Sequence, residues 1–312
     1  MELSIDWFGG RLGNNLIQVF NLILFCKKHK LKCIQKLDHQ IIGKFEVDFR
    51  EEGHEFDSSF IQHLNTIKGA RIKYMATYED IMRNKGCEFY DEYDPPNLCN
   101  SFYPYNITTD EKNDIFRTII IPNLKLRKDI QPLDPDILVI HIRSGDAIIA
   151  DNQSMFHESV PGNLDLYRSG TKNIIGAQPP VIAYEKLIPF FRKIIIVAEN
   201  NLNPCINYLA AKYPDKVTVQ MGTLIEDVEL ILSAQNLAFS SIYHGTFVHN
   251  LVYLSNNIKN AFVFEHMERE NYKEDYKYKD INTYVMLIDN YLDTYKTDNL
   301  TTWKGDIKFF KV

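Results

Sequence analysis

The sequence predicts an α/β protein, and three features of its 312 residues support this prediction. In the second half, short continuous apolar runs alternate with helical segments, a pattern typical of a parallel sheet covered on both faces. A shorter strand–loop–helix–strand pattern opens the chain. Apolar residues make up 45% and charged residues 24%, as in folded globular proteins. The length is sufficient for two domains.

The first half predicts a small number of elements, separated by a long stretch with weak signals. We expect a strand over 3–8, a glycine-rich turn over 9–15, a helix over 15–28, a strand over 31–37 and a helix over 110–121. Lys27 and Lys28 suit the carboxyl end of the first helix, where cations are favoured. Residues 38–107 are aromatic-rich and predict no regular element, and the proline-containing stretch 122–136 reads as a linker.

The second half predicts a doubly wound, Rossmann-like domain. Strands are expected over 137–142, 194–198, 217–220, 237–240 and 261–264, and helices over 180–191, 204–213, 225–234 and 245–254. In such sheets ligands bind outside the carboxyl ends of the strands. The loops after Ile142, Ala198 and Ser240 are therefore where a functional site is expected.

The C-terminal part completes the predicted organisation. The Lys/Tyr/Asp-rich run 272–280 reads as a solvated surface. Residues 284–295 predict a helix, and we expect the tail after it to pack back on the first domain. The predicted parts are an N-terminal Rossmann-like domain over 1–130, a ligand-binding domain over 131–283, and a helix and tail over 284–312.

Charge and cysteine content limit the possible partners and compartments. The net charge of −6 argues against general binding of nucleic acid. The five cysteines show no metal-binding or disulfide spacing, so we expect buried thiols in a reducing compartment. No signal peptide and no apolar segment long enough to span a bilayer is visible. These features favour the cytoplasm of a bacterium or of a virus-infected host cell.

The strongest local feature is the segment His-Ile-Arg-Ser-Gly-Asp at 141–146, at the end of a buried strand. The guanidinium of Arg143 offers a rigid fork of donors that matches phosphate oxygens. Gly145 allows a tight turn, and Asp146 can hold Arg143 or accept from a hydroxyl. The alternative is that Arg143 and Asp146 form an ion pair that closes the loop.

Two other loops could contribute to an anion site. Residues 240–247 join a buried strand to an apolar helix, and hydroxyls of Ser241 and Thr246 could assist the backbone N–H groups of the helix start. Ordinary helix capping is the alternative for this loop. The turn 9–15 resembles a nucleotide-binding glycine loop but matches neither standard glycine motif, and the alternative is a plain turn capped by Asn14.

Three segments together resemble the superfamily of α1,2-, α1,6- and protein O-fucosyltransferases. The segment 141–146 resembles the H-x-R-x-G-D motif of that superfamily. Residues 10–15, Gly-Arg-Leu-Gly-Asn-Asn, resemble its N-terminal G-[GR]-[LF]-G-N-Q motif, with Asn15 in place of Gln. The segment 227–247 is similar to its third motif, and the three occur in the family's order. Residues 38–130 show no recognisable similarity.

The resemblance implies a GT-B fold, with two Rossmann-like domains facing across a cleft, and transfer of fucose from GDP-fucose to a glycan hydroxyl with inversion and without metal. It implies that Arg143 binds the β-phosphate, that His141 lies beside the nucleoside, and that Asn14 and Gly13 reach the reaction centre. The other residues implied at the donor site are Glu199, Asn200, Asp227, Ser241, Gly245, Thr246 and Phe247.

The residues themselves support a cation-based rather than a metal-based site. Departure of a diphosphate must be stabilised by a metal or by fixed cations and a helix start. The one clear Asp-x-Asp, Asp134-Pro135-Asp136, precedes its strand and reads as a turn. The base that takes the acceptor proton is left open among Asp146 and acids of the 147–178 loop, namely Asp151, Glu158 and Asp165.

Two other functions are compatible with the sequence, and a third is disfavoured. Transfer of another sugar from a GDP or UDP donor fits the same phosphate-binding residues. A non-catalytic protein that binds a sugar nucleotide or a glycan fits the same fold. A dinucleotide oxidoreductase is disfavoured, because no G-x-G-x-x-G follows either strand that opens a domain.

Overall fold

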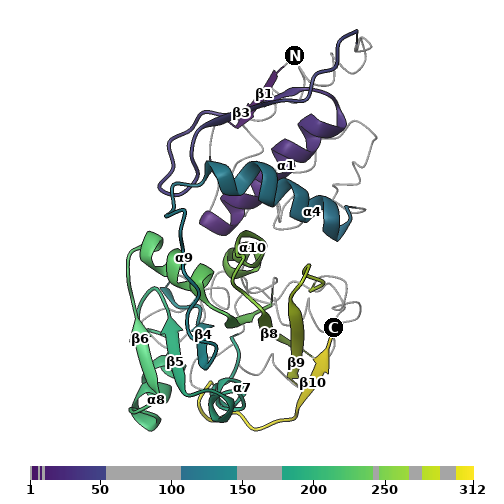
Figure 1. Ribbon diagram of the computed structural model, residues 1–312. Coiled ribbons are helices and arrows are strands. Elements are labelled where there is room, and N and C mark those ends of the chain that lie inside the picture. The colour runs from purple at the N-terminus through teal and green to yellow at the C-terminus, as the bar shows by residue number, and fades with distance from the viewer. Residues whose placement is uncertain are drawn as a thin grey trace, which may run out of the picture. The chain divides into compact units, whose positions relative to one another are not determined.

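A computed structural model gives the structure of the protein as two compact units, Met1–Lys125 and Leu126–Val312. The residues that it describes are 2–5, 8, 11–53, 107–145, 178–241, 246–266, 276–288 and 300–312. Figure 1 labels helices and strands of both units.

The first unit contains a three-stranded sheet in the order β1-β2-β3. Strand β1 (Glu2–Ile5) pairs parallel with β2 (Lys32–Gln35), and β2 pairs antiparallel with β3 (Phe45–Asp48). Helix α1 (Leu12–Lys28) makes the crossover from β1 to β2 and contacts both strands. The expected opening of strand, loop, helix and strand is confirmed.

Helix α1 begins earlier than the sequence predicted. Its N-cap is Arg11, whose side chain makes no capping hydrogen bond. Asn14 therefore lies in the first helical turn, and the alternative interpretation of Asn14 as the cap is wrong. The helix is buried along most of its length, so tertiary packing rather than a local cap determines where it starts. Its last turn carries Lys27 and Lys28, as expected.

The helix expected over 110–121 is present as three consecutive segments. Helix α4 (Thr109–Ile115) begins at Thr108, which forms a reciprocal capping box with Glu111. It continues as a π-helical turn, η1 (Phe116–Ile120), and a 3-10 turn, η2 (Ile121–Asn123). Phe116 stacks on Phe20 of α1 with ring centroids 5.3 Å apart, which joins the two helices of this unit.

The second unit is built on a seven-stranded sheet in the order β10-β9-β8-β7-β4-β5-β6. All neighbouring strands are parallel except β10, which is antiparallel to β9. The strands are β4 (Ile137–His141), β5 (Lys193–Val197), β6 (Val217–Gln220), β7 (Asn236–Ser240), β8 (Asn260–His266), β9 (Asn282–Ile288) and β10 (Ile307–Lys311). The predicted α/β class is confirmed for this unit.

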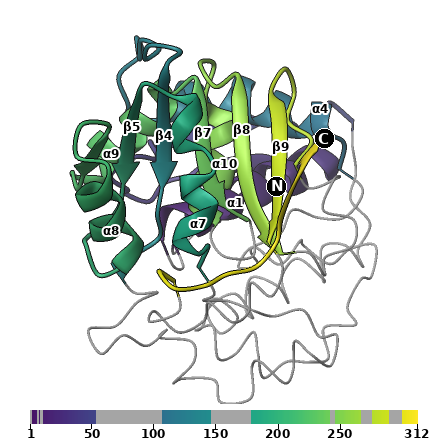
Figure 2. The same cartoon turned by 90° about the horizontal axis from the view of Figure 1, so that it is seen from below.

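Helices cover both faces of this sheet. They are α7 (Val181–Glu185), α8 (Pro204–Lys212), α9 (Leu224–Ser233) and α10 (Thr246–Leu254). Helix α7 packs against α8, and α9 packs against α10. Figure 2 shows α7 in front of the sheet and α10 behind it. The sheet is therefore the middle of three layers.

Helix α7 is shorter than the helix predicted over 180–191. It ends at Glu185, and a separate 3-10 turn, η5 (Ile188–Phe190), follows it. Pro189 lies within that turn and has no backbone N–H to continue an α-helix. The prediction of one continuous helix is wrong for this reason.

The strand order reverses at the centre of the sheet. From β4 the chain adds β5 and β6 on one side, then crosses over to add β7, β8 and β9 on the other. The two neighbours β4 and β7 therefore send their following loops in opposite directions. Such a reversal opens a crevice at the carboxyl ends of the two strands, where α/β proteins bind ligands.

The C-terminal region departs from the prediction. Residues 284–288 belong to β9 and not to a helix, and residues 289–299 lie outside the described part of the chain. A short apolar run such as Tyr-Val-Met-Leu-Ile fits a buried strand as well as a buried helix. The tail supplies β10, which pairs with β9 and extends the sheet of the second unit.

Part of the run 272–280 is buried, although the sequence indicated a solvated surface. Tyr276 donates a hydrogen bond to Oε2 of Glu265 at 2.8 Å, and its side chain is fully buried. The hydroxyl of Tyr278 lies 2.7 Å from Nδ1 of His249, also in a buried position. Lys277 and Lys279 are exposed, so these two tyrosines and two lysines face opposite environments.

The cysteines in the described ranges behave as predicted. Cys26, Cys33 and Cys205 are buried free thiols, whereas Cys87 and Cys99 lie outside those ranges. Within the same ranges, no helix combines the length and the apolar character that crossing a membrane requires.

Gly43 provides a test of packing in the first unit. Its N–H donates to the carbonyl of Asn123 at 2.8 Å, and a Cβ at this position would lie 2.5 Å from that oxygen. We expect Gly43→Ala to lower the free energy of unfolding by about 1–3 kcal/mol, because backbone must move to relieve the clash. Urea denaturation measures this, with the exposed neighbour Gln40→Ala as the control. Equal stability of the two variants would contradict the packing described.

Candidate functional site

The site is built around the loop that follows β4, at the reversal of the strand order. The amide of Ile142 donates to the carbonyl of Val197 at 3.0 Å, so the sheet pairing continues past the end of β4. Arg143 is therefore the first residue beyond the pairing, and it is partly buried. This is the position that the sequence predicted for its guanidinium.

Asn200 holds this loop through a single oxygen atom. Its Oδ1 accepts from the hydroxyl of Ser144 at 2.6 Å, from the amide of Gly145 at 3.2 Å and from the amide of Leu202 at 3.1 Å. The loops after β4 and β5 are thus joined by one amide side chain. Asn200, which the resemblance assigned to the donor, has a structural role that the sequence did not predict.

Asn203 makes a second connection between the same loops. Its Nδ2 donates to the carbonyl of Arg143 at 3.0 Å, and its Oδ1 accepts from the amide of Cys205 at 3.0 Å. Its own amide donates to the hydroxyl of Ser144 at 3.1 Å. Asn203 is thus the N-cap of α8 and also fixes the backbone that carries the Arg143 guanidinium.

Gly145 brings the loop close to Glu199. It has a φ of 65°, and a Cβ at this position would lie 1.9 Å from Oε2 of Glu199. Glycine is favoured here for two reasons: it adopts the left-handed backbone conformation without strain, and its lack of a side chain leaves room for this carboxylate. Glu199 is exposed, at the end of the neighbouring strand, where the sequence placed it.

His141 links the end of β4 to the start of α10. Its ring lies 5.4 Å from the ring of Phe247, measured between centroids, with the planes tilted by 55°. Burial of the imidazole, and secondly the positive charge of Arg143, lower the pKa of His141 to about 4. His141 is therefore neutral at neutral pH, and Arg143 supplies the positive charge of this loop.

Hydroxyl groups lie at the carboxyl end of β7, which is the other strand at the reversal of the strand order. Ser240 and Ser241 are buried, and the side-chain oxygen of Ser241 has no hydrogen-bond partner among the residues that the structure describes. Thr246 and Phe247 form the first turn of α10. A buried hydroxyl without a partner is costly, so a ligand oxygen at this edge would relieve that cost.

Asp227 lies away from the reversal of the strand order. Its Oδ1 accepts from the amide of Gly222 at 3.2 Å and from Nε2 of Gln220 at 3.4 Å, which holds the turn between β6 and α9. Burial raises its pKa. Strand β6 is the edge strand of the sheet, separated from β4 by β5. Asp227 therefore follows the edge strand rather than one of the two strands at the reversal.

The remaining predicted residues belong to the other unit or lie outside the described part of the chain. Gly13 and Asn14 lie in the first turn of α1, in the first unit. Asp146 and Gly245 fall outside the described residues, as do the alternative bases Asp151, Glu158 and Asp165. Five predicted residues lie at or after the carboxyl ends of central strands. His141 ends β4, Arg143 follows β4, and Glu199 follows β5. Ser241 follows β7, and Phe247 lies in the first turn of α10, the helix after β7.

The arrangement suits an anionic ligand. A guanidinium, buried hydroxyls and the N-terminus of a nine-residue helix, α10, occur on the two sides of the strand reversal, and each favours negative charge. In the described part of the chain, no cluster of three or more His, Cys, Asp or Glu side chains is arranged to hold a metal ion.

One residue that holds the candidate site in place was not predicted from the sequence. Asn203 positions the Arg143 backbone, yet it was not among the predicted site residues. The dipeptide Asn203-Pro204 does carry a readable signal, because Asn at the N-cap followed by Pro at the first helical position is a common helix start. The bond from Asn203 back to Arg143 spans 60 residues and has no sequence signal.

Comparison with known proteins adds no assignment. No family model matches the chain, and no curated protein matches it in sequence.

Asn200 can be tested with two substitutions. Asn200→Ala removes the acceptor of three hydrogen bonds, and we expect it to lower the free energy of unfolding of the second unit by about 2–4 kcal/mol. Asn200→Asp retains an oxygen acceptor at the same place, so its free energy of unfolding should fall much less. Thermal and urea denaturation measure both. Equal losses in the two variants would contradict a role based on acceptance of hydrogen bonds.

His141 predicts a dependence of stability on pH. Its folded pKa of about 4 lies below the ordinary value of 6.5. The unfolded chain therefore binds more protons in this window, and the free energy of unfolding falls as the pH drops from 6.5 towards 4. In His141→Gln, we expect the decrease in the free energy of unfolding between pH 6.5 and pH 4 to be about 1–3 kcal/mol smaller. Urea denaturation across this range measures the slope, and an unchanged slope in the variant would contradict the assignment.

Proposed function

We propose that the protein is an inverting, metal-independent glycosyltransferase that transfers fucose from GDP-fucose to a glycan hydroxyl. The observation that carries the proposal is the position of Arg143 directly after β4, beside the reversal of the strand order between β4 and β7. This edge of an α/β sheet is where a nucleotide is expected. The three motif resemblances supply the donor and the reaction class.

Arg143 suits the charge that develops in the reaction. The acceptor oxygen forms a bond to the anomeric carbon while the bond from that carbon to the β-phosphate oxygen breaks. The leaving nucleoside diphosphate takes the electron pair, and a fixed guanidinium close to its oxygens stabilises the new charge. Asn203 and Ser144 hold the backbone of Arg143 in place, so little reorganisation is needed when the charge appears.

Residues on both sides of the crevice extend this interaction. The hydroxyls of Ser241 and Thr246 and the start of α10 are suited to phosphate oxygens. His141 and Phe247 form an aromatic pair next to the expected nucleoside. The base that accepts the proton of the attacking hydroxyl is proposed among Asp146 and the acids of the 147–178 loop.

The choice of GDP as the donor nucleotide has chemical support in Glu199. A carboxylate can accept hydrogen bonds from the N1–H and the exocyclic amino group of guanine, and uracil offers no comparable pair of donors. Glu199 is exposed at the end of β5, next to the Arg143 loop. A GT-B arrangement, with the first unit on the acceptor side, is part of the same proposal.

Calorimetric titration of the full chain with GDP, UDP and CDP, with and without Mg²⁺, tests the proposal. We expect GDP to bind without metal and more tightly than the two pyrimidine nucleotides. We expect Arg143→Ala to weaken GDP binding by about 10- to 100-fold, because charge-assisted hydrogen bonds are lost. Release of GDP from GDP-fucose should fall at least as much.

Arg192 provides a matched control. It is an exposed arginine at the opposite, amino end of β5, where it pairs with Asp134 at 3.0 Å. Arg192→Ala should leave GDP binding unchanged. Equal effects of the two substitutions, or tight GDP binding by Arg143→Ala, would refute the site. Binding of GDP without any sugar transfer would favour a non-catalytic binding protein, and tighter binding of UDP would favour a different donor.

A further inference from the structure

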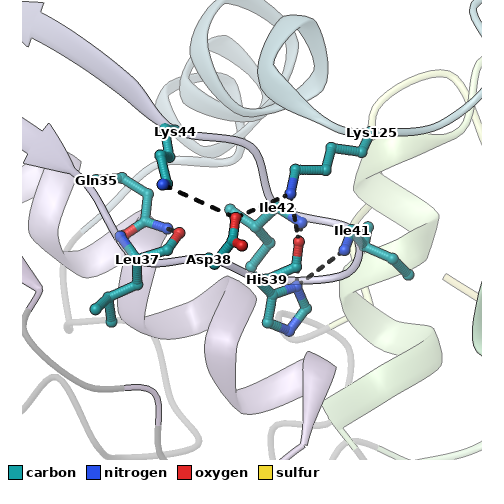
Figure 3. A network of polar contacts seen from close by, with 8 residues as sticks. All are labelled: Gln35, Leu37, Asp38, His39, Ile41, Ile42, Lys44 and Lys125. Carbon is teal, nitrogen blue, oxygen red and sulfur yellow. Dashed lines mark hydrogen bonds and ion pairs between the residues drawn. The ribbon is translucent and has the colours of Figure 1, made fainter.

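A histidine in the first unit has one ring nitrogen fully engaged and the other available. His39 lies in the loop over 36–44, between β2 and β3. Its Nδ1 accepts hydrogen bonds from the amides of Ile41 and Ile42, each at 3.1 Å (Figure 3). An imidazole nitrogen that accepts two hydrogen bonds carries no proton, so the proton resides on Nε2. Nε2 has no hydrogen-bond partner among the described residues.

The surroundings keep this imidazole neutral. Burial, and secondly the positive charge of Lys125, lower the pKa of His39. Lys125 donates from Nζ to the carbonyl of His39 at 2.8 Å, which fixes the loop from the other side. The ring is only partly buried. His39 therefore presents a fixed N–H donor at neutral pH.

The topology of the first unit places this donor where a ligand can be expected. Strands β1 and β2 are parallel, so the loops that follow them leave from the same edge of the sheet. Phe8 follows β1, and its ring lies 5.2 Å from the ring of His39 in an edge-to-face arrangement. Phe8 and His39 therefore lie at the carboxyl edge of the parallel pair, the edge that binds ligands in α/β folds.

The neighbouring groups complement the donor. The side chain of Asp38 is 85% exposed, and its Oδ1 lies 3.4 Å from Nζ of Lys125 and 3.9 Å from Nζ of Lys44. These long distances leave the carboxylate able to accept hydrogen bonds from a ligand. A fixed donor and an aromatic ring thus occur together, and the next residue along the chain carries an exposed acceptor (Figure 3 shows the Asp38 carboxylate directed at Lys44 and Lys125). Sugars present hydroxyls and apolar C–H faces that match such a set.

We propose that the 36–44 loop and Phe8 form a carbohydrate-binding site, in which Nε2–H of His39 donates a hydrogen bond to a sugar oxygen. The inference rests on the proposed function, in which the first unit receives the glycan acceptor. In this proposal His39 contacts the acceptor directly and is a binding residue. Residues 38–44 of this loop lie in a stretch where the sequence predicted no regular element, and the loop carries no recognised motif.

Two substitutions separate the proposed role of His39 from its structural role. In His39→Asn, Oδ1 occupies the place of Nδ1 and can still accept from the amides of Ile41 and Ile42, as asparagine does in turns, but the donor is lost. In His39→Gln, the side-chain amide can reach the place of Nε2 and donate, but the acceptor for the loop is lost. A purely structural histidine would tolerate Asn better than Gln, and a ligand donor would tolerate Gln better than Asn in binding.

The experiment is NMR titration of the full chain, labelled with ¹⁵N-histidine, with lactose, N-acetyllactosamine, chitobiose and mannobiose. We expect at least one disaccharide to shift the His39 imidazole signals. That sugar should bind His39→Asn about tenfold more weakly, as for one lost hydrogen bond, with an unchanged unfolding temperature. His39→Gln should retain more of the binding than His39→Asn.

Two outcomes would overturn the inference. One is that none of the four sugars perturbs His39, and the other is that His39→Asn binds the sugar as tightly as the unsubstituted protein. If His39→Gln does not fold, the Asn variant alone decides. GDP titration of the same preparations separates this inference from the proposed function. Absence of GDP binding with intact sugar binding would refute the transferase proposal and not the carbohydrate site.

Discussion

The candidate site depends on the acceptance of three hydrogen bonds by one side-chain oxygen, Oδ1 of Asn200. Loops after parallel strands have no sheet pairing of their own, so their shape must come from side chains. Asn200 determines this shape because its hydrogen bonds join the loop after β4, which carries Arg143, to the loop after β5. Asn203 adds a hydrogen bond to the carbonyl of Arg143. The guanidinium is thus carried on a backbone whose position is set before any ligand arrives.

In the first unit, too, side-chain hydrogen bonds to the backbone hold a loop in place, but the residues involved are different. There Nδ1 of His39 accepts two backbone amides, and Lys125 holds the carbonyl of the same residue. In both units a polar side chain satisfies the backbone of a loop at a carboxyl edge. Such satisfaction is needed because unpaired backbone groups in partly buried loops are costly. A rigid loop of this kind can present a functional group without a large loss of entropy on binding.

Sequence reasoning succeeded where a signal is local and failed where it is long-range. The strand that begins at Ile137 and the position of Arg143 after it follow from a continuous apolar run and its polar end. Strand β9 was predicted as a helix, because its apolar run is too short to show a period. The bonds made by Asn200 and the burial of Tyr276 depend on partners distant in sequence, which composition and spacing do not reveal.

The pairing of β4 with β7 has a consequence for how the protein acquires its structure. Leu138 lies beside Asn236, far along the chain, and the crevice exists only after that long loop has closed. Closing it costs chain entropy before the contact is gained, which makes the step slow. A nucleotide bound across these two strands would favour the closed topology by mass action. Any ligand that binds across these two strands would therefore stabilise the centre of the sheet.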